Sequence, residues 1–168
     1  MTERLYYTDS ALADFEASVV ESRVVDDRSH VVLDRTAFYP TSGGQPFDTG
    51  RLGAATVVEV IDRDDGEIVH VLDAPIDPSG RVRGVIDWPR RFDHMQQHTG
   101  QHILSAAFER EVSARTTSFH LGADAATIDL DRELTPPQMT AAERLANTVV
   151  WEDRPVTVRF ATSDGLWS

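Results

Sequence analysis

The chain contains no cysteine and no lysine among its 168 residues. The absence of cysteine excludes disulfides, thiol nucleophiles and thiolate metal ligands, so any metal would be held by histidine, aspartate or glutamate. No run of about 18 apolar residues occurs, which argues against a membrane-spanning helix. The first residues also lack the charged-then-apolar layout of a signal peptide. We therefore expect a cytoplasmic protein without a membrane partner.

Negative charge dominates the rest of the composition. The formal net charge is −12, and all 16 basic side chains are arginine. Because attraction to phosphate supplies most non-specific affinity for nucleic acid, RNA binding would need a local basic patch. The one candidate patch consists of Arg81, Arg83, Arg90 and Arg91. The chain has no Gly-x-Ser-x-Gly and no phosphate-binding glycine loop ending in lysine, which argues against covalent catalysis and nucleotide hydrolysis.

The first half of the chain has the pattern of short strands joined by turns. Turn sequences such as Asp26-Asp27-Arg28 and Asp64-Asp65-Gly66 separate the strands. The expected strands are residues 15–25, 29–35, 54–63, 67–73 and 81–88. A proline- and glycine-rich loop, residues 37–46, interrupts them. Strands without an intervening helix predict a small antiparallel β-barrel over residues 1–88.

The pattern changes near Pro89, after which apolar residues recur at helical spacing. We expect a long helix over residues 90–112, a hairpin of residues 115–121 and 125–130, and a helix that begins after Thr135. A last strand, 156–160, and a frayed tail, 161–168, follow. The predicted fold class is therefore α+β, with the barrel followed by a second α+β domain, residues 89–168, that opens with the long helix.

That helix carries His94, His98 and His102, spaced four residues apart. Side chains at this spacing are neighbours on a helix, and two imidazoles one turn apart can both bind a transition metal such as zinc. His98 and His102 are the preferred ligands, whereas His94 is a third ligand, a hydrogen-bonding partner of a ligand, or solvated. Thr99 stands where a zinc protease would carry its catalytic glutamate, which excludes that class of enzyme.

The remaining histidines and the glycine loop leave alternatives open. His120, in a predicted strand, either faces the histidine helix or is structural, whereas His30 and His70 are expected on strand surfaces. The segment Gly43-Gly44-Gln45 is either a plain turn or a backbone cradle for a polar ligand. Hydroxyl groups of Thr41 and Ser42 stand directly before it.

Four segments, in order, resemble the alanyl-tRNA editing proteins (AlaX) and the editing domain of alanyl-tRNA synthetase. They are residues 38–46 (Phe-Tyr-Pro-Thr-Ser-Gly-Gly-Gln-Pro), 97–104 (Gln-His-Thr-Gly-Gln-His-Ile-Leu), 118–122 (Ser-Phe-His-Leu-Gly) and 154–158 (Arg-Pro-Val-Thr-Val). The resemblance implies a hydrolase that removes serine or glycine from wrongly charged alanine tRNA. It implies a zinc held by His98 and His102, and an amino-acid pocket that includes Thr41, Ser42, Gly43, Gly44 and Gln45. His94, Gln101 and His120 would stand next to the metal ligands.

The sequence departs from the family at the second metal motif, Cys-x-x-x-His. It has no cysteine and no histidine after His120, and we expect the second domain to be incomplete at its C-terminus. Three explanations stay open. The chain is a truncated or frame-disrupted copy, a partner chain supplies the missing ligands, or the protein has lost the metal and persists as an inactive module that binds tRNA or a synthetase.

Overall fold

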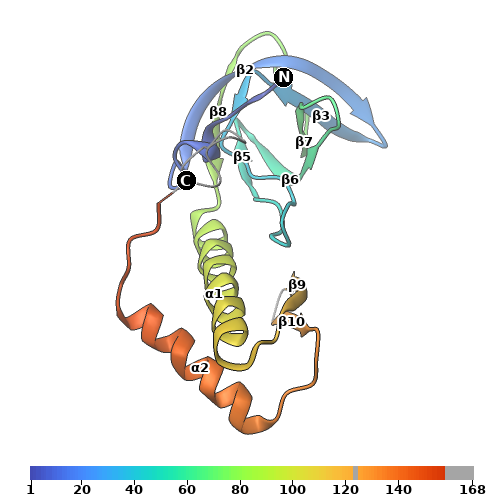
Figure 1. Cartoon of the computed structure of the whole chain (residues 1–168). Coiled ribbons are helices and arrows are strands. Elements are labelled where there is room, and N and C mark those ends of the chain that lie inside the picture. The colour runs from blue at the N-terminus through green and yellow to red at the C-terminus, as the bar shows by residue number, and fades with distance from the viewer. Residues whose placement is uncertain (123–124, 158–168) are drawn as a thin grey trace, which may run out of the picture. The chain divides into compact units, whose positions relative to one another are not determined.

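A computed structural model describes residues 1–122 and 125–157 (Figure 1). The chain divides into two compact units, of which the first contains residues 1–101 and 117–129 and the second contains the remainder. The elements of the first half are β1 (Glu3–Arg4), the short 3-10 helix η1 (Leu5–Tyr7), β2 (Asp14–Val25), β3 (Arg28–Leu33), β4 (Arg35–Thr36), β5 (Gly50–Leu52), β6 (Ala55–Asp62), β7 (Ile68–Leu72) and β8 (Arg81–Ile86). They are followed by α1 (Trp88–Val112), β9 (Thr116–Leu121), β10 (Ala126–Leu130) and α2 (Pro136–Trp151).

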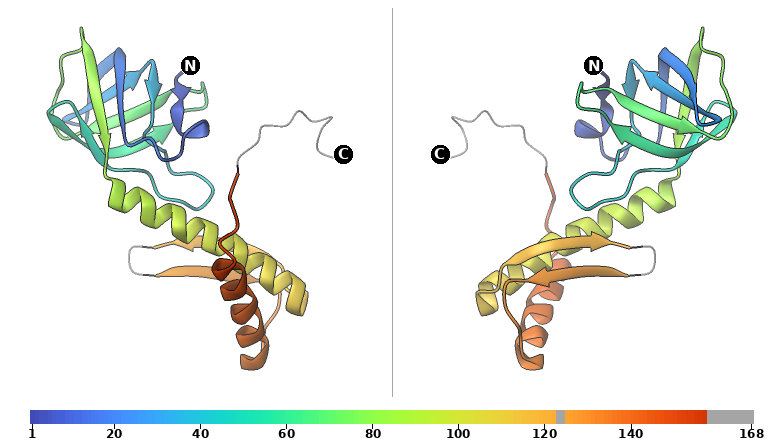
Figure 2. Two further views of the ribbon diagram at one scale, coloured as in Figure 1. Left: turned by 90° about the vertical axis from the view of Figure 1, so that its left-hand side faces the viewer. Right: turned by 90° about the vertical axis from the view of Figure 1, so that its right-hand side faces the viewer.

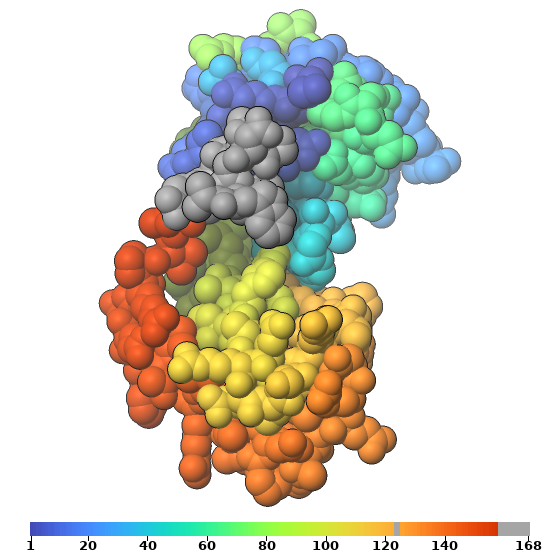
Figure 3. Space-filling view, viewed as in Figure 1, coloured from blue at the N-terminus to red at the C-terminus, as the bar shows by residue number. Residues whose placement is uncertain are grey.

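Six of these strands close into an antiparallel barrel in the order β2-β3-β7-β6-β5-β8. Figure 2 shows the strands surrounding a common interior, and Figure 3 shows the same blue-to-green segments as one continuous body. The α+β class and the five predicted barrel strands are confirmed, with ends shifted by a few residues. Sequence reasoning missed the sixth strand, β5, because three residues are too few to show an alternating pattern.

The missed strand depends on a glycine that lets two backbones approach closely. Gly50 begins β5 and is paired with Ile86 of β8. A Cβ atom on Gly50 would lie 2.2 Å from the carbonyl oxygen of Val85, and its φ is 155°. Any larger residue would therefore push β5 away from β8 and open the barrel.

The interior of the barrel is mostly apolar but contains one buried histidine. Phe38, Leu52, Ile68 and Leu72 are fully buried. His70 lies between Ile68 and Leu72 on the same face of β7, since alternate residues of a strand share a face, and it is also fully buried. The prediction that His70 lies on a strand surface is therefore wrong. Because β7 is buried along its whole length, its sequence lacks the alternation of apolar and polar residues from which the burial of His70 could have been predicted.

Hydrogen bonds satisfy both nitrogens of this buried ring. Nδ1 lies 3.1 Å from the carbonyl oxygen of Val31, so Nδ1 must carry the proton. Nε2 then accepts from the hydroxyl of Thr36 at 2.8 Å, and that hydroxyl oxygen accepts from the N–H of Phe38 at 3.1 Å. Burial lowers the pKa of His70 to about 4, although the hydrogen bond to Val31 opposes the shift. His70 is therefore a neutral core residue that holds the chain entering the 37–46 loop.

The elements after the barrel also match those predicted from the sequence. The long helix is α1, the hairpin is β9 with β10, and α2 begins after Thr135, whose backbone N–H donates to the side chain of Gln138 at 2.9 Å. No helix among the described residues is long and apolar enough to cross a membrane. Residues 158–168, which include most of the predicted last strand and the whole predicted tail, lie outside the described residues. The domain boundary at residue 88 stays a prediction.

Candidate substrate and metal site

The predicted glycine loop is the central part of a larger loop, residues 39–48, whose two ends meet. The backbone N–H of Asp48 donates to the carbonyl oxygen of Tyr39 at 2.9 Å. In return, the N–H of Tyr39 donates to a carboxylate oxygen of Asp48 at 2.7 Å. A loop closed in this way is held at its base, so its central residues take a defined position.

A buried ion pair fixes the base of this 39–48 loop to the first turns of α1. Arg91 and Asp48 are 2% and 0% exposed, and the Arg91 Nε donates to a carboxylate oxygen of Asp48 at 2.9 Å. The guanidinium also donates to the carbonyl oxygens of Ser10, at 3.0 Å, and Ala37. The prediction that Arg91 contacts RNA is wrong, because its donors are used inside the protein. Sequence reasoning missed Asp48, since nothing in the sequence indicates that it meets an arginine 43 residues away.

The tip of the 39–48 loop is a tight two-residue turn. Ser42 and Gln45 exchange backbone hydrogen bonds of 3.1 and 3.0 Å. Gly43 and Gly44 between them have φ of 58° and 80°, as type I′ turns require at both central positions. A Cβ on Gly44 would come within 3.2 Å of the Phe119 ring and carbonyl oxygen. One N–H group of the predicted ligand cradle, that of Gln45, is therefore used within the turn itself.

The turn brings Gln45 to the histidine helix. The Gln45 side chain is 6% exposed, and its Oε1 lies 3.0 Å from Nδ1 of His98. Because an amide oxygen only accepts, Nδ1 of His98 carries the proton, and the in-plane lone pair of the neutral ring lies on Nε2. A Cβ added to Gly43 would lie 3.6 Å from Cε1 of the same ring. Two segments that the sequence singled out separately are thus in direct contact.

The other candidate residues on α1 and β9 differ in exposure. His102 follows His98 by four residues on α1 and is exposed, and Gln101 is half-buried. His94 is buried, so it is not solvated, and its Nδ1 has no hydrogen-bond partner among the described residues. Burial, and then Arg90, lower the pKa of His94. His120 is exposed, whereas its neighbour Phe119 packs on Gly44; because adjacent strand residues point to opposite faces, His120 points away from that turn.

The described residues do not form a complete metal site. Within residues 1–122 and 125–157, no three His, Cys, Asp or Glu side chains are arranged to hold an ion. A zinc site in an enzyme normally has three protein ligands. His98 does fit as one ligand, because metal-binding histidines almost always donate from their other nitrogen to a fixed acceptor, as Nδ1 does here to Gln45. The described part of the chain therefore matches part of a zinc site only.

The remaining arginines of the predicted RNA patch are more accessible than Arg91. Arg81 and Arg83 lie on β8 with exposed side chains, and each pairs with an acidic residue of β2, Glu16 and Asp14. Arg90 is half-buried, and its guanidinium donates to the carbonyl oxygen of Phe47 at 3.2 Å. Arg90 thus helps to hold the 39–48 loop, which leaves Arg81 and Arg83 as the exposed part of the predicted patch.

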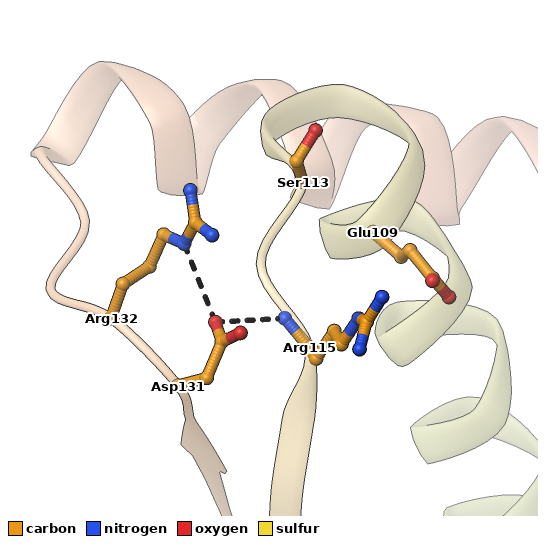
Figure 4. A pocket seen from close by; sticks show the side chains of 5 residues that line it. All are labelled: Glu109, Ser113, Arg115, Asp131 and Arg132. Carbon is orange, nitrogen blue, oxygen red and sulfur yellow. Dashed lines mark hydrogen bonds and ion pairs between the residues drawn. The ribbon is translucent and has the colours of Figure 1, made fainter.

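The second unit contains an open polar hollow of about 520 Å³. Figure 4 shows its lining, in which one Asp131 carboxylate oxygen accepts from the backbone N–H of Arg115 at 3.0 Å and from Arg132 Nε at 3.4 Å. Glu109 and Ser113 complete the lining. The hollow holds two acidic and two basic side chains, so it has no excess charge for an ionic ligand, and none of the predicted site residues lies there.

Comparison with known proteins agrees with the resemblance of the four segments. The family model for class II (A) tRNA synthetases matches residues 2–90. The alanyl-tRNA editing protein AlaX-M of Methanosarcina acetivorans is 42% identical over 172 residues, which cover 94% of this chain and 69% of the relative.

Two longer relatives match over nearly the same share of the chain. AlaX-L of Pyrococcus horikoshii is 39% identical over 94% of this chain and 41% of its own length. The alanine–tRNA ligase of Pyrococcus abyssi is 40% identical over 93% of this chain but 18% of its own length. With this identity over most of the chain, and with the loop and the histidine helix in contact, the chain belongs to the alanyl-tRNA editing protein (AlaX) family.

Proposed function

We propose that this chain is a trans-editing hydrolase that removes serine or glycine from wrongly charged alanine tRNA. The observation that carries the proposal is the contact between Gln45 and His98, which joins the 39–48 loop to the histidine helix. Two of the relatives named above are called alanyl-tRNA editing proteins, which supports alanine tRNA as the substrate. The bond to be broken is an ester, so holding it beside a water molecule supplies much of the acceleration.

Thr41 is the residue that we propose reads the amino acid. Its exposed hydroxyl stands at the start of the turn, where the oxygen accepts from the N–H of Phe47 at 3.1 Å. A hydroxyl has one donor and two acceptor positions, so one donor and one acceptor remain for a serine side chain. A site that hydrogen-bonds a substrate hydroxyl disfavours the analogue lacking it, here alanine. Glycine has no hydroxyl either, so its acceptance would depend on the size of the site.

We further propose zinc as the cofactor, with His98 and His102 as two of its ligands. The bond from Nδ1 of His98 to Gln45 orients the ring so that Nε2 presents its lone pair. A bound zinc would polarise the ester carbonyl or a water molecule. The described residues offer no third ligand to this pair, so the rest of the set would come from outside them, for example from a partner chain.

The incomplete ligand set favours one alternative of a different class. In that alternative the chain is an inactive editing module that binds tRNA or a synthetase without chemistry. The two proposals differ in metal content and turnover. Stoichiometric zinc together with hydrolysis excludes the inactive module, whereas tRNA binding without either supports it.

The deciding experiment is deacylation of serine-charged alanine tRNA by the purified chain, with and without added zinc. We expect hydrolysis that falls about 10- to 100-fold in Gln45→Ala, because removing the partner that orients a metal ligand has that effect. His98→Ala should lose more hydrolysis activity than Gln45→Ala. His30→Ala on β3 serves as a matched control and should hydrolyse the ester like the parent. No hydrolysis at excess protein with zinc present rejects the hydrolase, and unchanged hydrolysis by His98→Ala rejects this site.

A further inference from the structure

A small aromatic cavity lies beside the contact between Gln45 and His98. Its volume is about 210 Å³, and both of those residues line it. Three tyrosines also line it: Tyr6 and Tyr7 from η1, and Tyr39 from the base of the 39–48 loop. Ser10, Arg91 and Met95 complete the lining. The ring of Tyr6 contacts the other two edge-to-face, with centroid separations of 4.9 Å to Tyr7 and 5.2 Å to Tyr39.

One polar atom in this cavity wall has no partner within the described protein. Tyr6 is 7% exposed, and its hydroxyl oxygen is buried without a hydrogen bond to any described residue. Burying such a group unpaired costs about 1–3 kcal/mol, and native proteins rarely leave one without a purpose. Burial also raises the pKa of Tyr6, so the hydroxyl keeps its proton and can donate to a ligand at neutral pH.

We propose that this cavity receives the terminal adenine base of the tRNA whose ester lies at the 39–48 loop. The inference rests on the proposed function and extends it to the part of the substrate that is not cleaved. The aminoacyl ester and the terminal base are attached to the same ribose. When the ester is held at Gln45 and His98, the base must therefore lie within one sugar of that contact, where the tyrosine cavity lies.

The size and chemistry of the cavity favour a base over the amino acid. Pockets for whole drug-sized ligands measure roughly 300–1,000 Å³, so a cavity of about 210 Å³ suits one flat ring system. Aromatic walls are the usual platform for nucleobases, because every base has a face that stacks. Serine has a small polar side chain and glycine has none, so neither amino acid would pack against the three tyrosine rings. The hydroxyl of Tyr6 can donate to a ring nitrogen of the base, which would satisfy that buried group.

The test uses RNA without an attached amino acid, so it does not depend on catalysis. The probe is a hairpin copying the acceptor stem of alanine tRNA, with the fluorescent adenine analogue 2-aminopurine as its last base. A second hairpin carries a terminal ribose without a base. We expect the fluorescence to be quenched on binding, and the baseless hairpin to bind about fivefold or more weakly, as loss of one stacked base predicts. Equal affinity for the two hairpins, or no binding of either, overturns the proposal.

Two variants assign the effect to the cavity. Tyr39→Leu should remove most of the preference for the terminal base, whereas Phe92→Leu is the aromatic control, because Phe92 lies on α1 outside the cavity wall. Tyr6→Phe deletes only the unpaired hydroxyl, so it should fold at least as stably as the parent and yet weaken the preference for the base several-fold. Preference retained in a folded Tyr39→Leu, or unchanged in Tyr6→Phe, overturns the assignment. Base-dependent binding without deacylation would reject the proposed hydrolase activity but support the proposed site for the terminal base.

Discussion

Acidification from pH 7 to pH 5 is expected to destabilise the barrel through His70. Burial lowers the pKa of His70 to about 4 in the folded protein, whereas an unfolded histidine has a pKa near 6.5. The unfolded chain therefore binds the proton more readily, so protons favour unfolding. The contribution of His70 to stability is complete above pH 6.5 and is lost progressively as the pH falls towards 4.

The two pKa values give the size of the effect. A difference of about 2.5 units corresponds to about 3 kcal/mol over the whole window, at 1.36 kcal/mol per unit. Between pH 7 and pH 5 alone the same linkage gives about 2 kcal/mol, a large part of the stability of a typical domain. Carboxyl groups with lowered pKa, such as Asp73 beside the N–H of Thr56, titrate below this range and contribute little to it.

Urea unfolding between pH 5 and pH 7, at constant ionic strength, measures this loss. The matched variant is His70→Gln, whose amide can still donate and accept hydrogen bonds but does not titrate. The variant will be less stable at pH 7, and its stability should change with pH by about 2 kcal/mol less than that of the parent. Parallel pH profiles for the two proteins would refute the reasoning, since His94, which is also buried with a lowered pKa, is present in both.

Three further variants test the loop that positions the site and the exposed arginines of the predicted RNA patch. Asp48→Ala leaves the charge of its arginine partner buried and should cost about 3–5 kcal/mol in urea unfolding; a decrease below about 1 kcal/mol contradicts the buried ion pair. Gly44→Ala forces a left-handed φ on alanine and should cost about 1–2 kcal/mol, whereas Gly80→Ala, where a Cβ meets no atom within 4 Å, is the neutral control. Replacing both Arg81 and Arg83 with Gln should weaken tRNA binding and make the log–log dependence of affinity on salt shallower, by about one unit for each phosphate that these arginines bind. Unchanged affinity and slope would remove this surface from the RNA interface.

Local sequence patterns were enough to predict most elements but not their long-range partners. Alternating apolar residues and turn sequences revealed five barrel strands, and the spacing of Thr135 and Gln138 revealed the start of α2. Both signals act within a few residues of one another. Arg91 was misassigned because two adjacent arginines after a proline look like a basic patch, and only the fold brings Asp48 to it. The burial of His70 was hidden for the same reason, since its hydrogen-bonding partners come from other strands.

The candidate site is assembled from three segments that lie far apart in the sequence, and buried polar contacts hold them together. Tyr6 comes from η1, Gln45 from the 39–48 loop and His98 from α1. Asp48 binds both the base of that loop and the first turns of α1, so its replacement should weaken hydrolysis and terminal-base binding together. His70 holds the entry to the loop from inside the barrel, and its two ring nitrogens bond to β3 and β4 rather than to these three segments. At pH 7, where most molecules remain folded, His70→Gln should therefore lower stability and leave both activities nearly unchanged, which separates residues that support the fold from residues that position the site.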